Sequence, residues 1–107
     1  MYPKYLRDTI LQELNDSCEY LKKALDCIKR HPEWAKKLKL ISDDRYKAAQ
    51  SLYGIFLEVY KNSKESDTYM NSIRDGIIDN ITIISQKIDS YKETYDFLID
   101  SEGDDAP

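Results

Sequence analysis

Few side chains in this sequence have the types and spacing that catalysis requires. Histidine, a frequent general acid or base, occurs once, at His31, next to a proline in a segment whose composition indicates a turn. The serines and cysteines have no accompanying base, and the three glycines are scattered singly, so no phosphate-binding loop exists. Adjacent carboxylates such as Asp43 and Asp44 point about 100° apart on a helix, which suits capping better than acid–base chemistry. We therefore expect a protein that is not an enzyme and that uses no cofactor, no metal and no small-molecule substrate.

The two cysteines, Cys18 and Cys27, lie nine residues apart. On one helix this separation turns them about 180° from each other, so they cannot form a disulfide within it. We expect two reduced thiols, which suits the cytoplasm. No apolar run approaches the roughly 20 residues of a membrane span, and the N-terminus lacks the apolar core of a secretory signal. The sequence therefore predicts a cytoplasmic protein that does not associate with a membrane.

The charge pattern argues against nucleic acid as the partner. The formal net charge is −4, and the charged residues, 34% of the chain, mostly alternate in sign at helical spacings, which indicates solvated helix faces. Binding to a phosphate backbone needs clustered Lys and Arg, and the only basic cluster is the short group Lys36, Lys37 and Lys39. We expect a protein partner or a second copy of this chain, and no nucleic acid.

Apolar residues recur three and four positions apart over three long segments, which predicts three helices. The first runs from residue 4 to about 29, the second from 32 to about 62, and the third from 68 to about 99. The proline that opens the second segment suits the first position of a helix, and Ser66 or Asp67 suits the cap of the third helix.

These elements predict an all-α fold, an antiparallel up-down-up bundle of three long helices. Residues 1–100 form the single helical domain. Residues 101–107 contain no large apolar side chain, and we expect them to form a disordered acidic tail. Each helix carries apolar residues over more than a narrow seam, which leaves surface for a fourth element or for dimerisation.

The second predicted helix carries two apolar stripes side by side. The first consists of Trp34, Leu38, Ile41, Arg45, Ala48, Leu52, Ile55 and Val59, and the second of Tyr46, Ala49, Tyr53, Phe56 and Tyr60. Two stripes imply two packing partners for this helix. We expect Trp34 to close the core at one end of the rod. The cluster Ser42, Asp43 and Asp44 has the composition of a helix cap, which leaves open whether the helix continues through this point or kinks there.

Tyrosines are the most distinctive part of the second stripe. Tyr46, Tyr53 and Tyr60 follow one another at intervals of seven residues, and Tyr91 and Tyr95 of the third helix can extend the same patch. In one interpretation the stripe packs against the third helix with its hydroxyls at the rim. In the other it anchors a protein partner, because tyrosine buries a large area at a small entropy cost. These five tyrosines are the candidate partner-binding residues.

Glu13 is followed seven residues later by Tyr20 on the first predicted helix, and Arg45 and Ala48 stand three apart on the second. With this pattern, residues 10–61 resemble the first two helices of the ferritin-like superfamily, in the style of small rubrerythrin-type proteins. The resemblance implies that Glu13 matches a metal-binding Glu of the family. It also implies that Arg45 and Ala48 stand where the family has the Glu and the His of its Glu-x-x-His motif. Only Glu13 of the ligand set is present.

Arg45 is a charged residue in an otherwise apolar stripe. A buried arginine needs a carboxylate partner, for which Glu13 and Asp44 are the candidates. We predict a buried ion pair between Glu13 and Arg45, at the place where the metal of the family would lie. The alternative is that Arg45 lies at the edge of the bundle and extends its guanidinium to water.

The sequence as a whole predicts a small acidic protein–protein interaction module without enzymatic activity. Its abundance of Ile, Lys, Asn, Asp and Tyr is typical of AT-rich bacterial and phage genomes. One concrete form is therefore a phage-encoded or prophage-encoded inhibitor or adaptor that binds a host protein. The alternative function is a ferritin-like metal-binding protein or oxidoreductase with a composite site in a dimer, assembled from Glu13, Glu19, Asp44 and Asp79.

Overall fold

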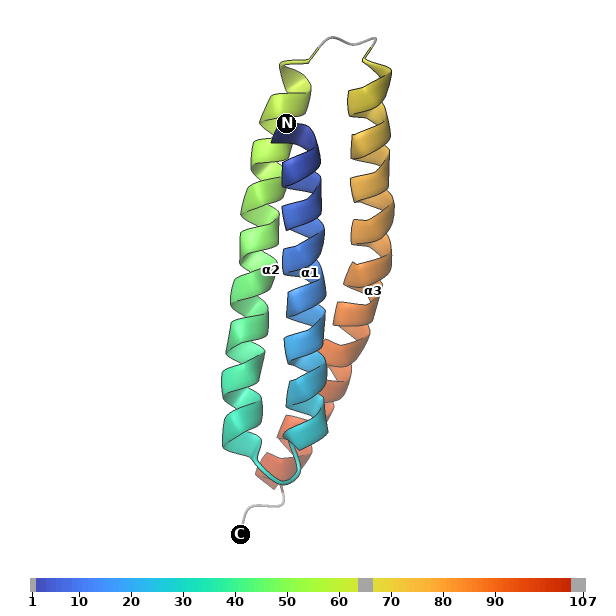
Figure 1. Cartoon of the computed structure of the whole chain (residues 1–107). Coiled ribbons are helices and arrows are strands. Elements are labelled where there is room, and N and C mark those ends of the chain that lie inside the picture. The colour runs from blue at the N-terminus through green and yellow to red at the C-terminus, as the bar shows by residue number, and fades with distance from the viewer. Residues whose placement is uncertain (1, 64–66, 105–107) are drawn as a thin grey trace.

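The computed structural model describes residues 2–63 and 67–104 of the 107-residue chain. It contains three α-helices, α1 (Tyr2–Cys27), α2 (Pro32–Lys61) and α3 (Thr68–Asp104), and no strand within the described residues. The predicted all-α fold of three long helices is therefore confirmed. Figure 1 shows α1 running down the rod, α2 returning beside it and α3 running down again. The rod measures 63 × 18 × 16 Å along its principal axes.

Hydrogen bonds link the end of α1 directly to the start of α2. The amide of His31 donates to the carbonyl of Cys27 at 2.7 Å, and the amide of Ala35 donates to the carbonyl of His31 at 3.0 Å. Pro32 occupies the start of α2, as predicted, where its missing N–H leaves no donor unsatisfied. The turn is therefore short, and it sets α2 directly against α1.

The start of α3 is fixed by a side-chain cap. The amide of Met70 donates to Asp67 Oδ1 at 3.1 Å, and the amide of Asn71 donates to the carbonyl of Asp67 at 3.1 Å. Asp67 is therefore the N-cap, which was one of the two predicted caps. The other, Ser66, lies outside the described residues.

The end of α3 differs from the prediction. The helix was expected to end near Ile99, but it continues to Asp104, so the prediction of a disordered tail is wrong for residues 101–104. No glycine or proline lies between Ile99 and Gly103, and Ser101 Oγ donates to the carbonyl of Phe97 at 2.9 Å, which satisfies the hydroxyl inside the helix. The remaining part of the predicted tail, residues 105–107, lies outside the described residues.

The core is built around α1, which packs along both other helices. α2 and α3 approach each other far less closely than either approaches α1. The buried residues of α1 are Leu6, Ile10, Leu14, Ser17, Leu21 and Ala24, and the buried Ile28 follows directly after the helix. The buried residues of α2 lie at intervals of seven and are Ala35, Ser42, Ala49 and Phe56. Three of these four are small, and the distance between two packed helices depends on the side chains at the contact, so α2 can lie close to α1.

This single buried row on α2 replaces the two packed stripes that the sequence predicts. Within the first predicted stripe, Trp34 is 57% exposed and Ile55 is 49% exposed. Of the two predicted packing partners, α1 approaches α2 closely along its length, whereas α3 contacts α2 through long side chains such as Tyr46 and Tyr60. Trp34 does not close the core either. Its ring stacks on that of His31, with the centroids 3.7 Å apart, outside the bundle.

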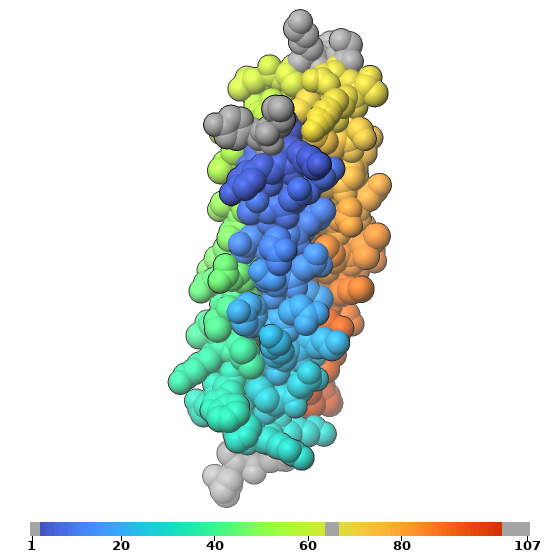
Figure 2. All heavy atoms as spheres, in the orientation of Figure 1, coloured from blue at the N-terminus to red at the C-terminus, as the bar shows by residue number. Residues whose placement is uncertain are grey.

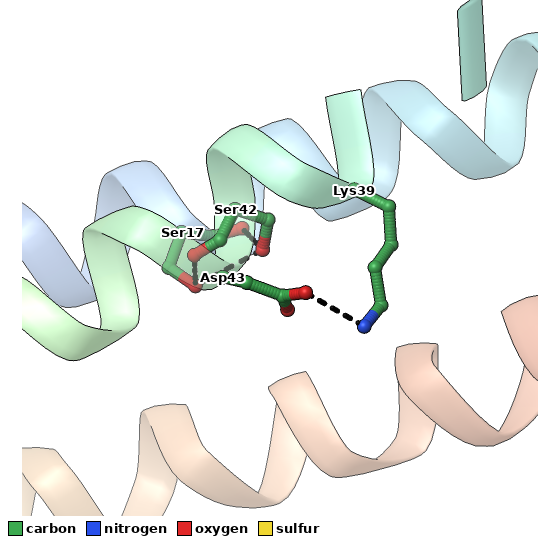
Figure 3. A network of polar contacts seen from close by, with 4 residues as sticks. All are labelled: Ser17, Lys39, Ser42 and Asp43. Atoms are coloured by element: carbon green, nitrogen blue, oxygen red, sulfur yellow. Dashed lines mark hydrogen bonds and ion pairs between the residues drawn. The ribbon is translucent and has the colours of Figure 1, made fainter. Parts of the chain in front are cut away.

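Two buried serines join α1 and α2 where the helices meet at mid-length (Figure 3). Ser17 Oγ donates to the carbonyl of Ser42 at 2.9 Å, Ser42 Oγ donates to the carbonyl of Ser17 at 2.6 Å, and the two hydroxyl oxygens are 3.1 Å apart. Both hydroxyls are thus satisfied in the dry interior. Ser42 is part of one uninterrupted helix, so α2 neither breaks nor kinks into separate segments at the predicted cap cluster.

Replacing Ser42 with a large residue should force the two helices apart. We expect Ser42→Leu to lower the free energy of unfolding by about 1–3 kcal/mol, because overpacking displaces α1 from α2. Ser42→Ala removes one hydrogen bond and leaves the volume nearly unchanged, so we expect a loss of about 1 kcal/mol. Urea denaturation followed by circular dichroism measures both values. Ser72→Leu on the exposed side of α3 is the matched control, and an equal loss there would show that the serine pair does not set the helix spacing.

Candidate functional site

The described residues do not assemble a metal-binding cluster. No group of three or more His, Cys, Asp or Glu residues within the described part of the chain is placed to hold a metal ion. Cys18 and Cys27 are both free and partly buried. Burial raises the pKa of the Cys18 thiol, and the nearby Lys87 only partly opposes this effect, so the thiol is protonated at neutral pH and is a weak nucleophile.

Arg45 forms its predicted contact with Glu13 between α2 and α1. The Arg45 Nη1 to Glu13 Oε2 distance is 3.4 Å. The predicted burial of this pair is wrong, because the Arg45 side chain is 46% exposed while that of Glu13 is 18% exposed. The long arginine stem carries the guanidinium to the rim of the α1–α2 contact, where water solvates it. The pair therefore ties two helix surfaces together weakly rather than replacing a metal inside the bundle.

A groove runs between α2 and α3. On the face shown in Figure 2, α1 fills the space between the other two helices. The groove has a volume of about 300 Å³ and is lined by Ile10, Leu14, Tyr46, Ala49, Gln50, Tyr53, Ile78, Ile81, Thr82 and Ser85. Only two of these residues belong to α1, and both are buried, so α1 forms the floor and the groove opens away from it. We call this feature the α2/α3 groove.

Tyr46 and Tyr53 form the α2 wall of the α2/α3 groove. Both side chains are half-buried, so each ring has one side on the core and another on the groove. The Lys92 ammonium of α3 lies 5.0 Å from the centroid of the Tyr46 ring, a cation–π contact that spans the two helices. The Tyr53 ring stacks on that of the buried Phe56, with the centroids 6.4 Å apart. The core thus holds these two rings in fixed positions.

Tyr60 closes the bundle at the end where α2 and α3 meet. Its hydroxyl donates to Asn71 Oδ1 at 2.6 Å and accepts a hydrogen bond from Arg74 Nη1 at 2.6 Å. The Arg74 guanidinium carbon also lies 5.0 Å from the centroid of the Tyr60 ring. Tyr60 contacts the beginning of α3 and Tyr46 contacts Lys92 further along it, so the two helices run in opposite directions. The hydroxyl and the ring of Tyr60 are thus engaged by residues of α3, and Tyr60 does not line the groove.

The predicted extension of the tyrosine patch into α3 is not what the structure shows. Tyr95 is 7% exposed and belongs to the core. Burial raises the pKa of its hydroxyl, and the charges of Asp96 and Asp43 add to the effect. Tyr91 lines a shallow depression made of α3 residues alone, apart from the α2/α3 groove. Of the five predicted partner-binding tyrosines, the groove therefore brings together only Tyr46 and Tyr53.

Sequence reasoning missed the α3 side of this groove. Ile78 lies on the α3 wall of the groove, and its side chain is 42% exposed. On α2, Leu57 follows Tyr53 by one helical turn, and its side chain is also 42% exposed. Further along the same side of α3 is a set of exposed carboxylates that we call the acidic row: Asp75, Asp79, Asp89, Glu93, Asp96 and Asp100.

The acidic row borders the groove because it shares a helical stripe with Thr82, which lines it. Its members and Thr82 follow one another at separations of four, three, seven, four, three and four residues, so they follow one side of α3. Within the described residues, Asp75 is the only member that forms an ion pair, with the adjacent Arg74 at 3.0 Å. The regular spacing of these acidic residues can be seen in the sequence, but it does not by itself indicate a binding site, because solvated helix faces commonly show the same spacing.

No protein-family model, curated protein or solved structure shows significant similarity to this chain. The resemblance to ferritin-like proteins therefore stays a prediction. Within the described residues, no helix is both long enough and apolar enough to cross a lipid bilayer.

Removing the Tyr60 hydroxyl should loosen the junction between α2 and α3. We expect Tyr60→Phe to lower the free energy of unfolding by about 1 kcal/mol, because both the Asn71 and the Arg74 hydrogen bonds are lost while the ring remains packed. Thermal and urea unfolding measure this change. Tyr69→Phe is the control, since Tyr69 is an exposed tyrosine on the same helix as Asn71 and Arg74. An equally stable Tyr60→Phe variant would contradict a structural role for the hydroxyl.

Proposed function

We propose that this chain is a non-enzymatic interaction module that binds a basic amphipathic helix of another protein in the α2/α3 groove. The observation that carries the proposal is the open groove itself, with Tyr46 and Tyr53 on one wall, Ile78 on the other and acidic side chains along its border. Its apolar floor and few polar groups are typical of binding sites for apolar side chains.

The shape of the groove favours a helix as the bound element. α2 and α3 flank α1, so a fourth helix laid between them would complete a four-helix bundle. Helices bind in such grooves through apolar side chains spaced three, four and seven residues apart. Tyr46 and Tyr53 are seven residues apart, about 10.5 Å along α2, which matches two turns of a bound helix.

The charge beside the groove favours a basic partner. The acidic row follows α3 along the groove and beyond it, and within the described residues its members from Asp79 to Asp100 have no basic side chain in an ion pair with them. A partner helix with Lys or Arg along one flank would face these carboxylates when its apolar side lies in the groove. Such a charge pattern accelerates association and rejects acidic helices.

The composition of the chain, rich in Ile, Lys, Asn, Asp and Tyr, supports a phage-encoded or prophage-encoded form of this module. A host protein with an exposed basic helix is then the first class of partner to examine. An inhibitor would cover that helix, and an adaptor would connect it to another protein.

Binding of designed peptides tests the proposal in the absence of the natural partner. The probes are helical peptides of about 18 residues, or five turns, with Leu on one face and Lys on the other. We expect the Leu/Lys peptide to bind by isothermal titration calorimetry. A peptide with Glu in place of Lys, and a scrambled Leu/Lys peptide of equal charge without an apolar face, should bind roughly tenfold more weakly or not at all.

Groove variants show where the peptide binds. Tyr53→Lys and Ile78→Lys put a charge on opposite walls and should each weaken binding of the Leu/Lys peptide by roughly tenfold or more. Tyr69→Lys adds the same charge on an exposed residue outside the groove and serves as the control. Circular dichroism confirms that each variant is folded. Equal binding by all three variants, or equal binding of the scrambled peptide, would contradict the proposal.

A further inference from the structure

A second surface of α2 lies on the side opposite the groove. Ile41, Ala48 and Ile55 each precede a buried residue of α2 by one position, whereas the groove residue Gln50 follows the buried Ala49 by one. One position is about 100° of helical rotation, so the two sets flank the buried row on opposite sides. We call this surface the outer α2 face, and it consists of Lys37, Ile41, Asp44, Ala48, Ser51, Ile55 and Glu58.

The outer α2 face contains two isoleucines whose side chains are exposed to solvent. Its members alternate at spacings of four and three residues, which places them on one straight stripe of the helix. Ile41 and Ile55 are both exposed, and the four polar members are exposed as well. The stripe is therefore amphipathic, with apolar and small residues at intervals of seven and charged or hydroxyl residues between them.

The order of residues along this face is nearly symmetric about Ala48. Ile41 lies seven residues before Ala48, and Ile55 lies seven residues after it. Lys37 lies eleven residues before, and the oppositely charged Glu58 lies ten residues after. A sequence with this symmetry matches itself when one copy is turned end over end, which is the requirement for a two-fold interface in which both copies use the same patch.

We propose that two copies of this chain dimerise through the outer α2 face, with their α2 helices antiparallel and crossing at Ala48. In this arrangement Ile41 packs against Ile55 of the partner subunit, and the small Ala48 lets the two helix backbones approach each other. Lys37 faces Glu58 of the partner subunit, and the two-fold axis repeats both contacts. The proposal is independent of the proposed function, because the α2/α3 groove remains open on the other flank of α2.

Charge decides the direction of the two helices. Lys37 and Glu58 are both exposed, and within the described residues neither forms an ion pair. An antiparallel dimer pairs these opposite charges twice, and it places the Asp44 carboxylate opposite the hydroxyl of Ser51 of the partner subunit, which can donate to it. A parallel dimer would set lysine against lysine, aspartate against aspartate and glutamate against glutamate, so like charges oppose it.

Charge reversal tests this arrangement by sedimentation equilibrium at several concentrations. We expect the wild-type chain to approach twice its monomer mass as concentration rises. Lys37→Glu alone and Glu58→Lys alone each create two repulsive pairs across the axis and should raise the dimer dissociation constant roughly tenfold or more. The double variant Lys37→Glu/Glu58→Lys restores both attractive pairs and should dimerise like the wild type. An equimolar mixture of the two single variants should do the same.

Two controls test whether the charge reversals weaken the proposed dimer contact itself or act through the overall charge of the protein. Lys22→Glu makes the same change on an exposed position of α1 and should leave the dissociation constant unchanged. Binding of the Leu/Lys peptide should also persist in Lys37→Glu, which keeps this test apart from that of the groove. A wild-type chain that stays monomeric up to about 1 mM, a level that excludes affinities of biological use, would overturn the proposal. So would a dimer that the single reversals do not weaken, or that the double reversal does not restore.

Discussion

The close contact between α1 and α2 at Ser17 and Ser42 is the constraint from which the rest of the structure follows. A rod only 18 × 16 Å across has little interior, so a polar pair in that interior must be fully satisfied. The two hydroxyls and two carbonyls satisfy each other, and no buried side-chain nitrogen or oxygen among the described residues lacks a partner. With small residues above and below this point on α2, the first two helices form one tight pair along their length.

That tight pair determines where α3 can lie. α2 turns one narrow row toward α1, and α3 packs on the side of α1 that remains apolar, with Ile77, Ile84, Ile88 and Tyr95 buried. Two flanks of α2 are consequently left with only partial cover. One becomes a wall of the α2/α3 groove and the other the outer α2 face, so α2 contributes to both candidate interaction surfaces.

The sequence predicted the elements of this fold better than their mutual placement. Helical periodicity, Pro32 and Asp67 indicated the number of helices and the start of two of them, because these signals are local. The position of α3 is a tertiary property, and both flanks of α2 carry apolar residues, so periodicity alone could not tell which flank is covered. For the same reason periodicity predicts a surface position for Tyr95, which is buried, and leaves two alternatives for Arg45, of which the structure shows the one at the edge of the bundle. The predicted end of α3 lies too early because the polar composition after Ile99 is typical of a tail, although glutamate and serine can also continue a helix.

The fluorescence of Trp34, whose ring stacks on that of His31, reports on one small part of the protein. The chain contains one tryptophan, so all of its tryptophan emission arises from the first turn of α2, at the end of the rod away from the Tyr60 junction. Circular dichroism, by contrast, averages over all three helices. If the turn opens before the bundle melts, the two signals will separate along a denaturation curve, and if the rod melts as one cooperative unit they will coincide.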